Sequence, residues 1–515
     1  MNNSAAILRA LIVYAICMPL AIVVGYITVL LVNSPSYSNL VVIGGLALIL
    51  SAPILLRWHH PLLVLCWNLP LTAFFLPGRP GVYLPMLAIS LGISVLQRAV
   101  NRNHHFISAP QITWPLLCLI LVALGTARLT GGIGLHSLGN ETMGGKKYIE
   151  LMAGILGFFA FTARRIPPHQ AGLYMALFLL PFCVSVFSDL IAFIPSSLYF
   201  IYWFISPDLY AATGSENTMR LAGVATMGTA LFAYLLARYG INGIFRAGKP
   251  WRVAALILCF TLVFWGGFRS GLVNCGLLFL ILFFVEGMHR TKLLPKLVSF
   301  GVFAAVICLP MASRLPNTFQ RVLSFLPVNI DPLVRADAQA TLDWRIEMWK
   351  ALLPQVPSHL LLGKGYAITQ LDYQLMGRDT AFHSIDPSQQ GLALAGDYHN
   401  GLLSVILPFG IWGLIVFLWF LIASVWALRR NRLYGDTALQ GFNNFLFAYF
   451  LMNAIGFFVL AGALSSHFAN FTSCLGLSIS LNGGICRPAR QPAEAPAETA
   501  ARVPVRPRLQ PAFQR

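Results

Sequence analysis

The sequence predicts an all-α, polytopic integral membrane protein with about 12–14 transmembrane helices and one large loop outside the membrane. Composition is the first observation behind this fold class. Of the 515 residues, 57% are hydrophobic and only 10% are charged, and the mean hydropathy is +0.72. Soluble globular chains carry roughly 25% charged residues. This chain therefore lacks the charge needed to cover a water-exposed surface.

The arrangement of the apolar residues is the second observation. A helix needs about 20 mostly apolar residues to cross a bilayer. Such runs lie near residues 10–32, 39–56, 61–76, 82–97, 112–127, 148–163, 171–194, 221–237, 253–267, 270–288, 297–312, 400–427, 441–461 and 465–484. The first run lacks a small-residue cleavage site after a short core, so we expect a retained helix rather than a signal peptide. The helix count depends most on the pairs 39–56/61–76 and 441–461/465–484, because their connections are very short.

The distribution of basic residues is the third observation. A net charge of +18 and a pI near 9.8 would suit a nucleic-acid partner, but the basic residues stand in short clusters between apolar runs. With the N-terminus inside, six short inside loops hold 15 basic residues and the short outside loops hold six. The positive-inside rule then predicts cytoplasmic N- and C-termini. The partner indicated by the charge is the lipid bilayer, with no nucleic acid.

The nine cysteines stand singly in apolar stretches, without CxxC pairs or Cys/His ligand spacing. This argues against a disulfide scaffold and against a zinc site. We therefore expect no metal and no cofactor.

Two stretches depart from the alternation of spans and short loops. Residues 313–399 form a long outside loop with eight acidic and seven basic residues, and its apolar patches predict that it packs. The part after Cys486 is rich in Pro, Ala and Arg and has no apolar periodicity. Residues 485–515 are therefore expected to be a disordered basic tail in the cytoplasm.

Ionisable residues at the end of a transmembrane helix are costly, and this makes them functional candidates. Arg220 is expected at the outer mouth of a helix, where an arginine also reaches lipid headgroups without any other role. Arg269 occupies a tight turn between two spans. The glycines around it, Gly266-Gly-Phe-Arg269-Ser-Gly271, let helices approach closely, so a structural role is at least as well supported as ligand contact.

Arg345 lies in residues 344–350, whose apolar pattern is helical. Arg345 and Trp349 share one helix face at i, i+4. Two simpler interpretations stay open: Arg345 stacks on a tryptophan, and Glu347 forms only a solvated pair with Lys350.

His399 lies at the start of the span 400–427, in Asp397-Tyr-His399-Asn400. One interpretation is a hydrogen-bonded interfacial histidine; the other is a base that accepts a proton near neutral pH. Asp397 and Asn400 are both close enough in sequence to fix its tautomer.

Three arginines and one histidine are thus expected on one outside face. Guanidinium groups bind phosphate bidentately, and a histidine can deprotonate a hydroxyl. This combination suits glycosyl transfer from a sugar diphosphate lipid. The alternative is a transporter or flippase of lipid-linked oligosaccharide, which needs ionisable sites near the bilayer midplane. Asp189 and Glu150 are the main acidic candidates there, and the outer-face location of the other four favours chemistry over transport.

The motifs also follow a familiar order. Arg345-Ile-Glu-Met-Trp349 is followed by Leu361-Leu-Gly-Lys-Gly365, then by His399-Asn400, then by Leu407-Pro-Phe-Gly410-Ile-Trp-Gly413, and it is preceded by Met219-Arg220-Leu-Ala-Gly223 and Phe268-Arg269-Ser-Gly271. In this order they resemble the O-antigen ligase/polymerase superfamily, which includes lipopolysaccharide O-antigen ligases, Wzy-type polysaccharide polymerases and pilin oligosaccharyltransferases. The resemblance covers roughly residues 216–425. The family usually continues the Arg220 motif with an Asn-Pro-Asn type sequence, where this chain reads Val224-Ala-Thr-Met-Gly228.

The resemblance implies a metal-independent, inverting glycosyltransferase of the bacterial inner membrane, with a periplasmic active site, in lipopolysaccharide or exopolysaccharide biosynthesis. Its donor would be a glycan on undecaprenyl diphosphate, and its acceptor a glycan or lipid core. By resemblance, Arg220 and Arg345 bind the diphosphate, His399 activates the acceptor hydroxyl, and Arg269 has a binding or structural role. Polymerase and ligase stay open; the oligosaccharyltransferase branch fits least, since the tail is short.

The resemblance also divides the chain. We expect N-terminal transmembrane helices at 1–215, a ligase/polymerase-like core at 216–427 that includes the periplasmic loop 313–399, C-terminal transmembrane helices at 428–484, and the tail at 485–515.

Overall fold

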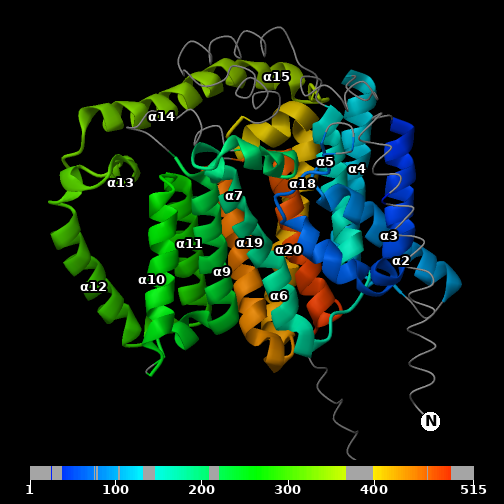
Figure 1. The fold of residues 1–515 in the computed structure, drawn as a ribbon, viewed down its shortest axis with the longest axis horizontal. Coiled ribbons are helices and arrows are strands. Elements are labelled where there is room, and N and C mark those ends of the chain that lie inside the picture. Colours follow the sequence, from blue (N-terminus) through cyan, green and yellow to red (C-terminus); the bar gives the residue numbers. More distant parts are fainter. Residues whose placement is uncertain are drawn as a thin grey trace, which may run out of the picture.

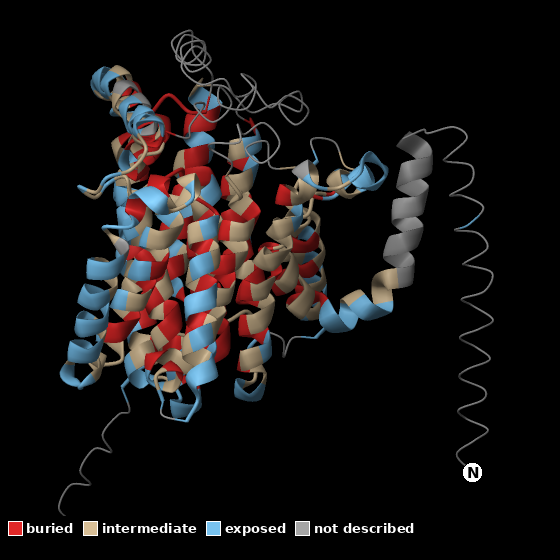
Figure 2. Cartoon of the chain, turned by 60° about the vertical axis from the view of Figure 1, so that its left-hand side comes forward, coloured by how far each residue is buried: buried red, intermediate tan, exposed pale blue. Residues whose placement is uncertain are grey.

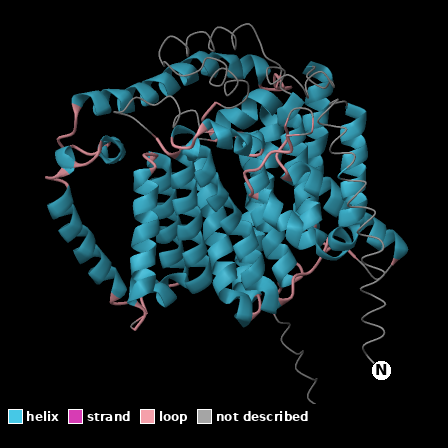
Figure 3. Cartoon of the chain, viewed as in Figure 1, coloured by secondary structure: helices cyan, strands magenta, loops and turns pink. Residues whose placement is uncertain are grey.

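The computed structural model describes Gly25 and residues 37–74, 76, 79–101, 105–130, 145–207, 220–246, 248–366, 398–460 and 462–488. Within these ranges the chain folds into helices and loops (Figure 3), and the β-structure amounts to one isolated bridge between Thr72 and Gly81. The predicted all-α class is confirmed.

The α-helices are, in chain order, α2 (Tyr37–Trp67), α3 (Tyr83–Val100), α4 (Pro110–Thr130), α5 (Gly145–Phe161), α6 (Ala171–Leu179), α7 (Val186–Asp189), α9 (Ala222–Ile244), α10 (Pro250–Trp265), α11 (Arg269–Val285), α12 (Leu293–Cys308), α13 (Asn317–Leu323), α14 (Pro332–Leu352), α15 (Val356–His359), α18 (Gly401–Tyr434), α19 (Gln440–Val459) and α20 (Leu464–Asn482). Most of them stand side by side in a bundle, and α14 and α15 lie across one end of it (Figure 1).

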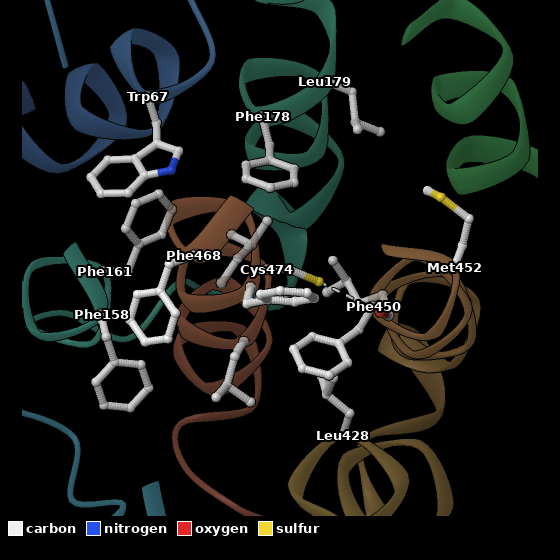
Figure 4. Close-up of a cluster of buried hydrophobic side chains, with 14 of the residues drawn as sticks. Trp67, Phe158, Phe161, Phe178, Leu179, Leu428, Phe450, Met452, Phe468 and Cys474 are labelled. Atoms are coloured by element: carbon white, nitrogen blue, oxygen red, sulfur yellow. Dashed lines mark hydrogen bonds between the residues drawn. The ribbon is translucent and has the colours of Figure 1, made fainter. Parts of the chain in front are cut away.

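Small residues let the central helices approach closely. A Cβ atom on Gly476 of α20 would lie 2.7 Å from the Cβ of Phe161 on α5, and one on Gly157 would lie 2.0 Å from the Trp67 ring. Figure 4 shows Trp67 and Phe161 in the aromatic cluster that also contains Phe468. Close backbone approach through glycine is typical of helix packing inside membranes, where van der Waals contact replaces the hydrophobic effect.

The outside of the bundle is apolar as well. On α12 the side chains of Val302, Phe303 and Val306 are 60%, 64% and 68% exposed, and Figure 2 shows exposed residues along the outer faces of several helices. Such a surface suits lipid as the solvent. Among the described residues, six helical segments are long and apolar enough to cross a membrane, and the helices at 250–265, 269–285 and 293–307 are shorter but apolar.

Three predicted spans differ in the structure: 39–56 and 61–76 join in one helix, and 171–194 changes its helix type. Residues 57–60, predicted as a connection, lie inside α2, and α2 ends at Trp67 instead of continuing to residue 76. Pro70 lies just beyond, and proline removes a helix donor and disfavours helix in the residue before it. The predicted span 171–194 changes to a 3₁₀ helix at Leu180–Ser185, where Pro181 has the same effect.

Three basic loops gather at one end of the bundle. The C-terminal ends of α9, α11 and α18 lie together, because Arg432 donates to the Val285 carbonyl at 2.8 Å and Glu286 accepts from the Ile241 amide at 2.9 Å. This end carries the basic loops 238–252, 289–296 and 428–440. The opposite end carries α14 and the start of α18 (Figure 1).

Candidate functional site

Asp337, on α14, joins two arginines from different parts of the chain. Its Oδ2 atom accepts from Arg321 Nε at 2.5 Å and from Arg220 Nη2 at 3.3 Å. Burial alone would raise the pKa of Asp337, but the two guanidinium groups outweigh burial and hold this pKa below its ordinary value. Two guanidinium groups that converge on one carboxylate oxygen have the arrangement needed to bind an anion.

Arg220 is positioned by the capping of α9, which begins two residues later. The carboxylate of Asp189 accepts from the amides of Gly223 at 2.9 Å and Val224 at 2.7 Å, so it satisfies donors that a helix N-terminus leaves open. A Cβ atom on Gly223 would lie 2.0 Å from the Ser185 carbonyl oxygen, which explains the glycine of this motif. Asp189, one of the two acidic candidates for a transport site, therefore has a structural role.

Arg269 is the first residue of α11 and ties this helix to the segment above it. It donates to the Ala338 carbonyl at 3.1 Å and to Ser324 Oγ at 3.4 Å. The guanidinium group of Arg269 also has electrostatic interactions with Arg321, Arg345 and Asp337. Arg269 thus has the structural contacts that its turn predicted, and it lies within electrostatic reach of the other arginines.

Arg345 and Trp349 point from one face of α14 toward two other helices. Arg345 Nη1 donates to the Leu460 carbonyl at 3.2 Å, and Trp349 Nε1 donates to the Tyr398 carbonyl at 2.9 Å. The helix predicted at 344–350 and the shared face are confirmed. The side chain of Glu347 lies outside the described part of the structure, so its pairing with Lys350 stays a prediction.

His399 occupies a tight turn before α18. Its φ of +46° is in the left-handed region, which costs a residue with a side chain about 1–2 kcal/mol. Both neighbours are held: Trp349 fixes the Tyr398 carbonyl, and Asn400 Oδ1 caps α18 by accepting from the Leu402 amide at 3.0 Å. The turn thereby sets the position of the half-buried imidazole. Asp397, the other residue considered for its tautomer, lies outside the described residues.

The contacts of α19 bring Arg345 close to the His399 turn. Leu460, whose carbonyl binds Arg345, directly follows α19. Gly462 touches the backbone at the start of α18, since a Cβ atom on it would lie 2.5 Å from the Cα of Gly401. His399 is two residues before Gly401. The four candidate residues from the sequence, three arginines and His399, therefore all lie at the same end of the bundle.

Residues 360–366 dock onto a break in α18. The amide of Lys364 donates to the Leu407 carbonyl at 2.8 Å, and the amide of Ile411 donates to the Leu360 carbonyl at 2.7 Å. Gly363 and Gly410 have φ values of +71° and +63°. The Gly-Lys-Gly segment and the Leu-Pro-Phe-Gly segment, which are more than 40 residues apart in sequence, are thus two sides of one contact.

Three charged residues of this end were not among the sequence candidates. Arg321 and Asp337 form the ion pairs described above. Lys364 is buried, and its ammonium nitrogen lies 5.6 Å from the centroid of the Tyr398 ring. The Gly-Lys-Gly motif is a signal that could have indicated Lys364, whereas no spacing in the sequence links residues 321 and 337 to residue 220.

The fold and this end of the bundle define a multi-pass, all-α membrane protein with arginines and a histidine at one mouth. Residues 254–418 match the protein-family model described as O-Antigen ligase. The match supports the resemblance of this region to the O-antigen ligase/polymerase superfamily. The matched region is about a third of the chain; it contains Arg269, Arg345 and His399, and Arg220 precedes it. No curated protein matches the chain.

Proposed function

We propose that the protein is an inner-membrane glycosyltransferase that transfers or polymerises a glycan from an undecaprenyl-diphosphate-linked donor at the periplasmic face. One observation carries the proposal: Arg220 and Arg321 converge on one oxygen of Asp337, at the end of the bundle that also holds His399. An anionic group already occupies the position between the guanidinium groups, and a diphosphate has the charge and the acceptor oxygens to take its place.

The arginines stabilise the leaving group. As the sugar–oxygen bond of the donor breaks, negative charge accumulates on the diphosphate, and fixed guanidinium groups lower the energy of that state. Arg220 and Arg345 bind the diphosphate together with Arg321; Arg345 lies at the same end of the bundle and donates to the Leu460 carbonyl just after α19. Because the arginines supply this charge, we propose a reaction that needs no metal ion.

His399 activates the acceptor. A ring nitrogen of His399 takes the proton of the acceptor hydroxyl, and the oxygen attacks the anomeric carbon from the face opposite the diphosphate. A new glycosidic bond forms, the bond to the diphosphate breaks, and the leaving group departs with the electron pair, so the anomeric configuration inverts. A histidine suits this step because its ordinary pKa lies near neutral pH.

The location of the charged groups supports transfer rather than transport. A transporter of the lipid-linked glycan needs ionisable groups or broken helices near the bilayer midplane. Asp189 caps α9 instead, the arginines lie at a helix mouth, and residues 360–366 satisfy the backbone groups at the break of α18. A ligase and a polymerase differ in their acceptor. The pattern of glycan products on a gel identifies that acceptor.

The test is complementation of a deletion strain with His399→Ala, with His359→Ala as the matched control. His359 lies on α15 at the same end, and its ring hydrogen-bonds to the Gln355 carbonyl one turn earlier in the chain. Glycan ladders and undecaprenyl-linked precursor are resolved on gels, and the membrane level of each variant is measured. We expect His399→Ala to lose the glycan product and to accumulate precursor at the periplasmic face, while His359→Ala behaves as wild type.

If His399→Ala makes normal glycan at a normal membrane level, His399 is not the base that activates the acceptor. Precursor retained at the cytoplasmic face would contradict the transferase proposal and favour a transporter. Loss of ladder spacing with a retained single unit identifies a polymerase, and loss of all transfer to lipid core identifies a ligase.

A further inference from the structure

A basic cavity opens at the end of the molecule opposite the arginines of the proposed active site. It has a volume of about 640 Å³ and is lined by Arg57, Arg98, Arg164 and His105, all exposed, with no acidic residue in its wall. Within the described residues the ion pairs involve Asp337, so these three guanidinium groups have none. A cavity with three uncompensated positive charges attracts an anion.

An apolar groove continues from this cavity along the outside of the bundle. A second cavity, of about 730 Å³, shares Arg98 and Phe106 with the first, and a third, of about 340 Å³, shares Leu91 and Leu156 with the second. The walls come from α3, α4 and α5. Along α4 the groove extends from Thr113 to Ala127, which is roughly 21 Å of helix and most of the hydrocarbon thickness of a bilayer.

The combination of a cationic pocket and a long apolar groove fits a molecule with an anionic phosphate group and a long apolar chain. A free phosphate would use the arginines but not the groove, and a neutral lipid would use the groove but not the arginines. Basic pockets between transmembrane helices at the cytoplasmic side suit anionic headgroups, and guanidinium groups bind phosphate oxygens bidentately.

We propose that this surface is a binding site for an anionic phospholipid. The phosphate lies among Arg57, Arg98 and Arg164, and one acyl chain follows the groove between α3 and α4/α5. The site is separate from the proposed donor site, since it lies at the other end of the bundle: Ile166, two residues after Arg164, donates to the Ser480 carbonyl near the C-terminal end of α20, whereas the N-terminal end of α20 follows Gly462, which contacts Gly401. It does not depend on the transferase proposal.

The experiment uses the fluorescence of Trp114, which lines the groove and is 61% exposed. The purified full-length protein is titrated in detergent with phosphatidylglycerol whose acyl chains carry bromine, a quencher at short range, and with phosphatidylcholine of the same chains. The difference between wild type and Trp114→Phe isolates the Trp114 signal. We expect the phosphatidylglycerol to quench this signal at a concentration about tenfold lower than phosphatidylcholine.

Substitutions test the headgroup and the chain separately. The double variant Arg98→Gln/Arg164→Gln is expected to abolish the tenfold preference. The matched variant Arg290→Gln/Lys292→Gln, at the same end but outside the cavity, is expected to keep it. Val95→Phe narrows the groove beside Arg98 and leaves every arginine in place, so it is expected to reduce quenching by both lipids.

Several results would overturn the proposal. Equal quenching by both lipids, or an unchanged preference in the double variant with normal thermal stability, contradicts a headgroup site. Displacement of the brominated lipid by inorganic phosphate at comparable concentration shows a site for free phosphate. Absence of Trp114 quenching by either lipid shows that something else fills the groove, for example the apolar segment 10–32 of this chain.

Discussion

Single charged residues decide what the mouth of the bundle can bind. Asp337 compensates Arg220 and Arg321, and its exposed fraction of 29% leaves it accessible to competition by a stronger anion. Arg321 is only 6% exposed, so its charge is held in place and poorly solvated. A donor diphosphate that replaces the carboxylate would therefore gain two positioned, charged donors.

Arg321→Gln tests this exchange. A hydrogen bond to a charged group contributes about 1.5–3 kcal/mol, so we expect kcat/KM for the lipid-linked donor to fall by about 10- to 100-fold. The control is Arg335→Gln, whose guanidinium donates to the Val328 carbonyl and not to Asp337. Equal losses in both variants, measured by transfer assays on purified protein, would contradict a specific role of Arg321.

The backbone at His399 offers a way to separate chemistry from stability. At φ of +46° a glycine is more favourable than an alanine, by about 1 kcal/mol. We expect His399→Gly and His399→Ala to be equally inactive, and His399→Gly to have the higher thermal unfolding midpoint in detergent. A His399→Gly variant that retains full glycan transfer would show that the turn, and not the imidazole, is required.

At the scale of elements, we expect the end of the bundle that holds the proposed site to depend on the contact between residues 360–366 and the break in α18. A Cβ atom on Gly363 would lie 2.2 Å from the Pro408 carbonyl oxygen, and the residue has a positive φ. Gly363→Ala is therefore expected to destabilise the fold by at least about 1–3 kcal/mol. Thermal unfolding followed by tryptophan fluorescence measures this effect.

The control for Gly363→Ala is Gly276→Ala, on α11, where a new Cβ atom meets nothing within 4 Å. A helical alanine is favoured over glycine, so this variant is expected to be neutral or slightly stabilising. Similar midpoints for the two variants would mean that the contact with α18 contributes little to stability.

The docking of α14 is expected to depend on pH through Asp337. Its pKa is held below the ordinary value of 3.8 by Arg321 and Arg220. A depressed pKa adds stability that is present above the ordinary value and is lost as the pH falls through the folded-state pKa.

We therefore expect Asp337→Asn to lower the thermal midpoint near pH 7 and to differ less from wild type as the pH approaches about 3. Asp343→Asn, an exposed carboxylate on the same helix, serves as the control. A constant difference between wild type and Asp337→Asn across this pH range would exclude the ion pairs as its cause.

For the whole molecule, the gathering of the basic connecting loops at one end predicts its orientation. The basic loops lie at one end and α14 at the other. By the positive-inside rule the end with the basic loops is expected to face the cytoplasm. This would place the arginines and His399 at the periplasmic face.

Cysteine labelling tests the orientation. Ser358 on α15 and Lys292 before α12 are exposed at opposite ends. In whole cells, a membrane-impermeant maleimide is expected to label Ser358→Cys above the background of the wild-type cysteines. Lys292→Cys is expected to react only after permeabilisation, and the reverse pattern would invert the topology and exclude a periplasmic site.

The sequence predicted where helices lie better than where they end, and the prolines show why. Apolar runs located nearly all the described helices, because burial in lipid requires them whatever the partners are. The run 61–76 was wrong at its end, since Pro70 interrupts it while its hydropathy continues. Hydropathy averages over a window and does not register the restriction that a proline places on the residue before it.

The sequence by itself identified the candidate residues at the ends of transmembrane helices. Only the tertiary structure showed which of them lie together. Arg220, Arg269, Arg345 and His399 are recognisable because charge at a membrane boundary is costly. Arg321 and Asp337 were missed because their significance lies in contacts with Arg220, about 100 residues away. Composition and periodicity are local properties of a chain, whereas an anion site is made by residues that the fold brings together.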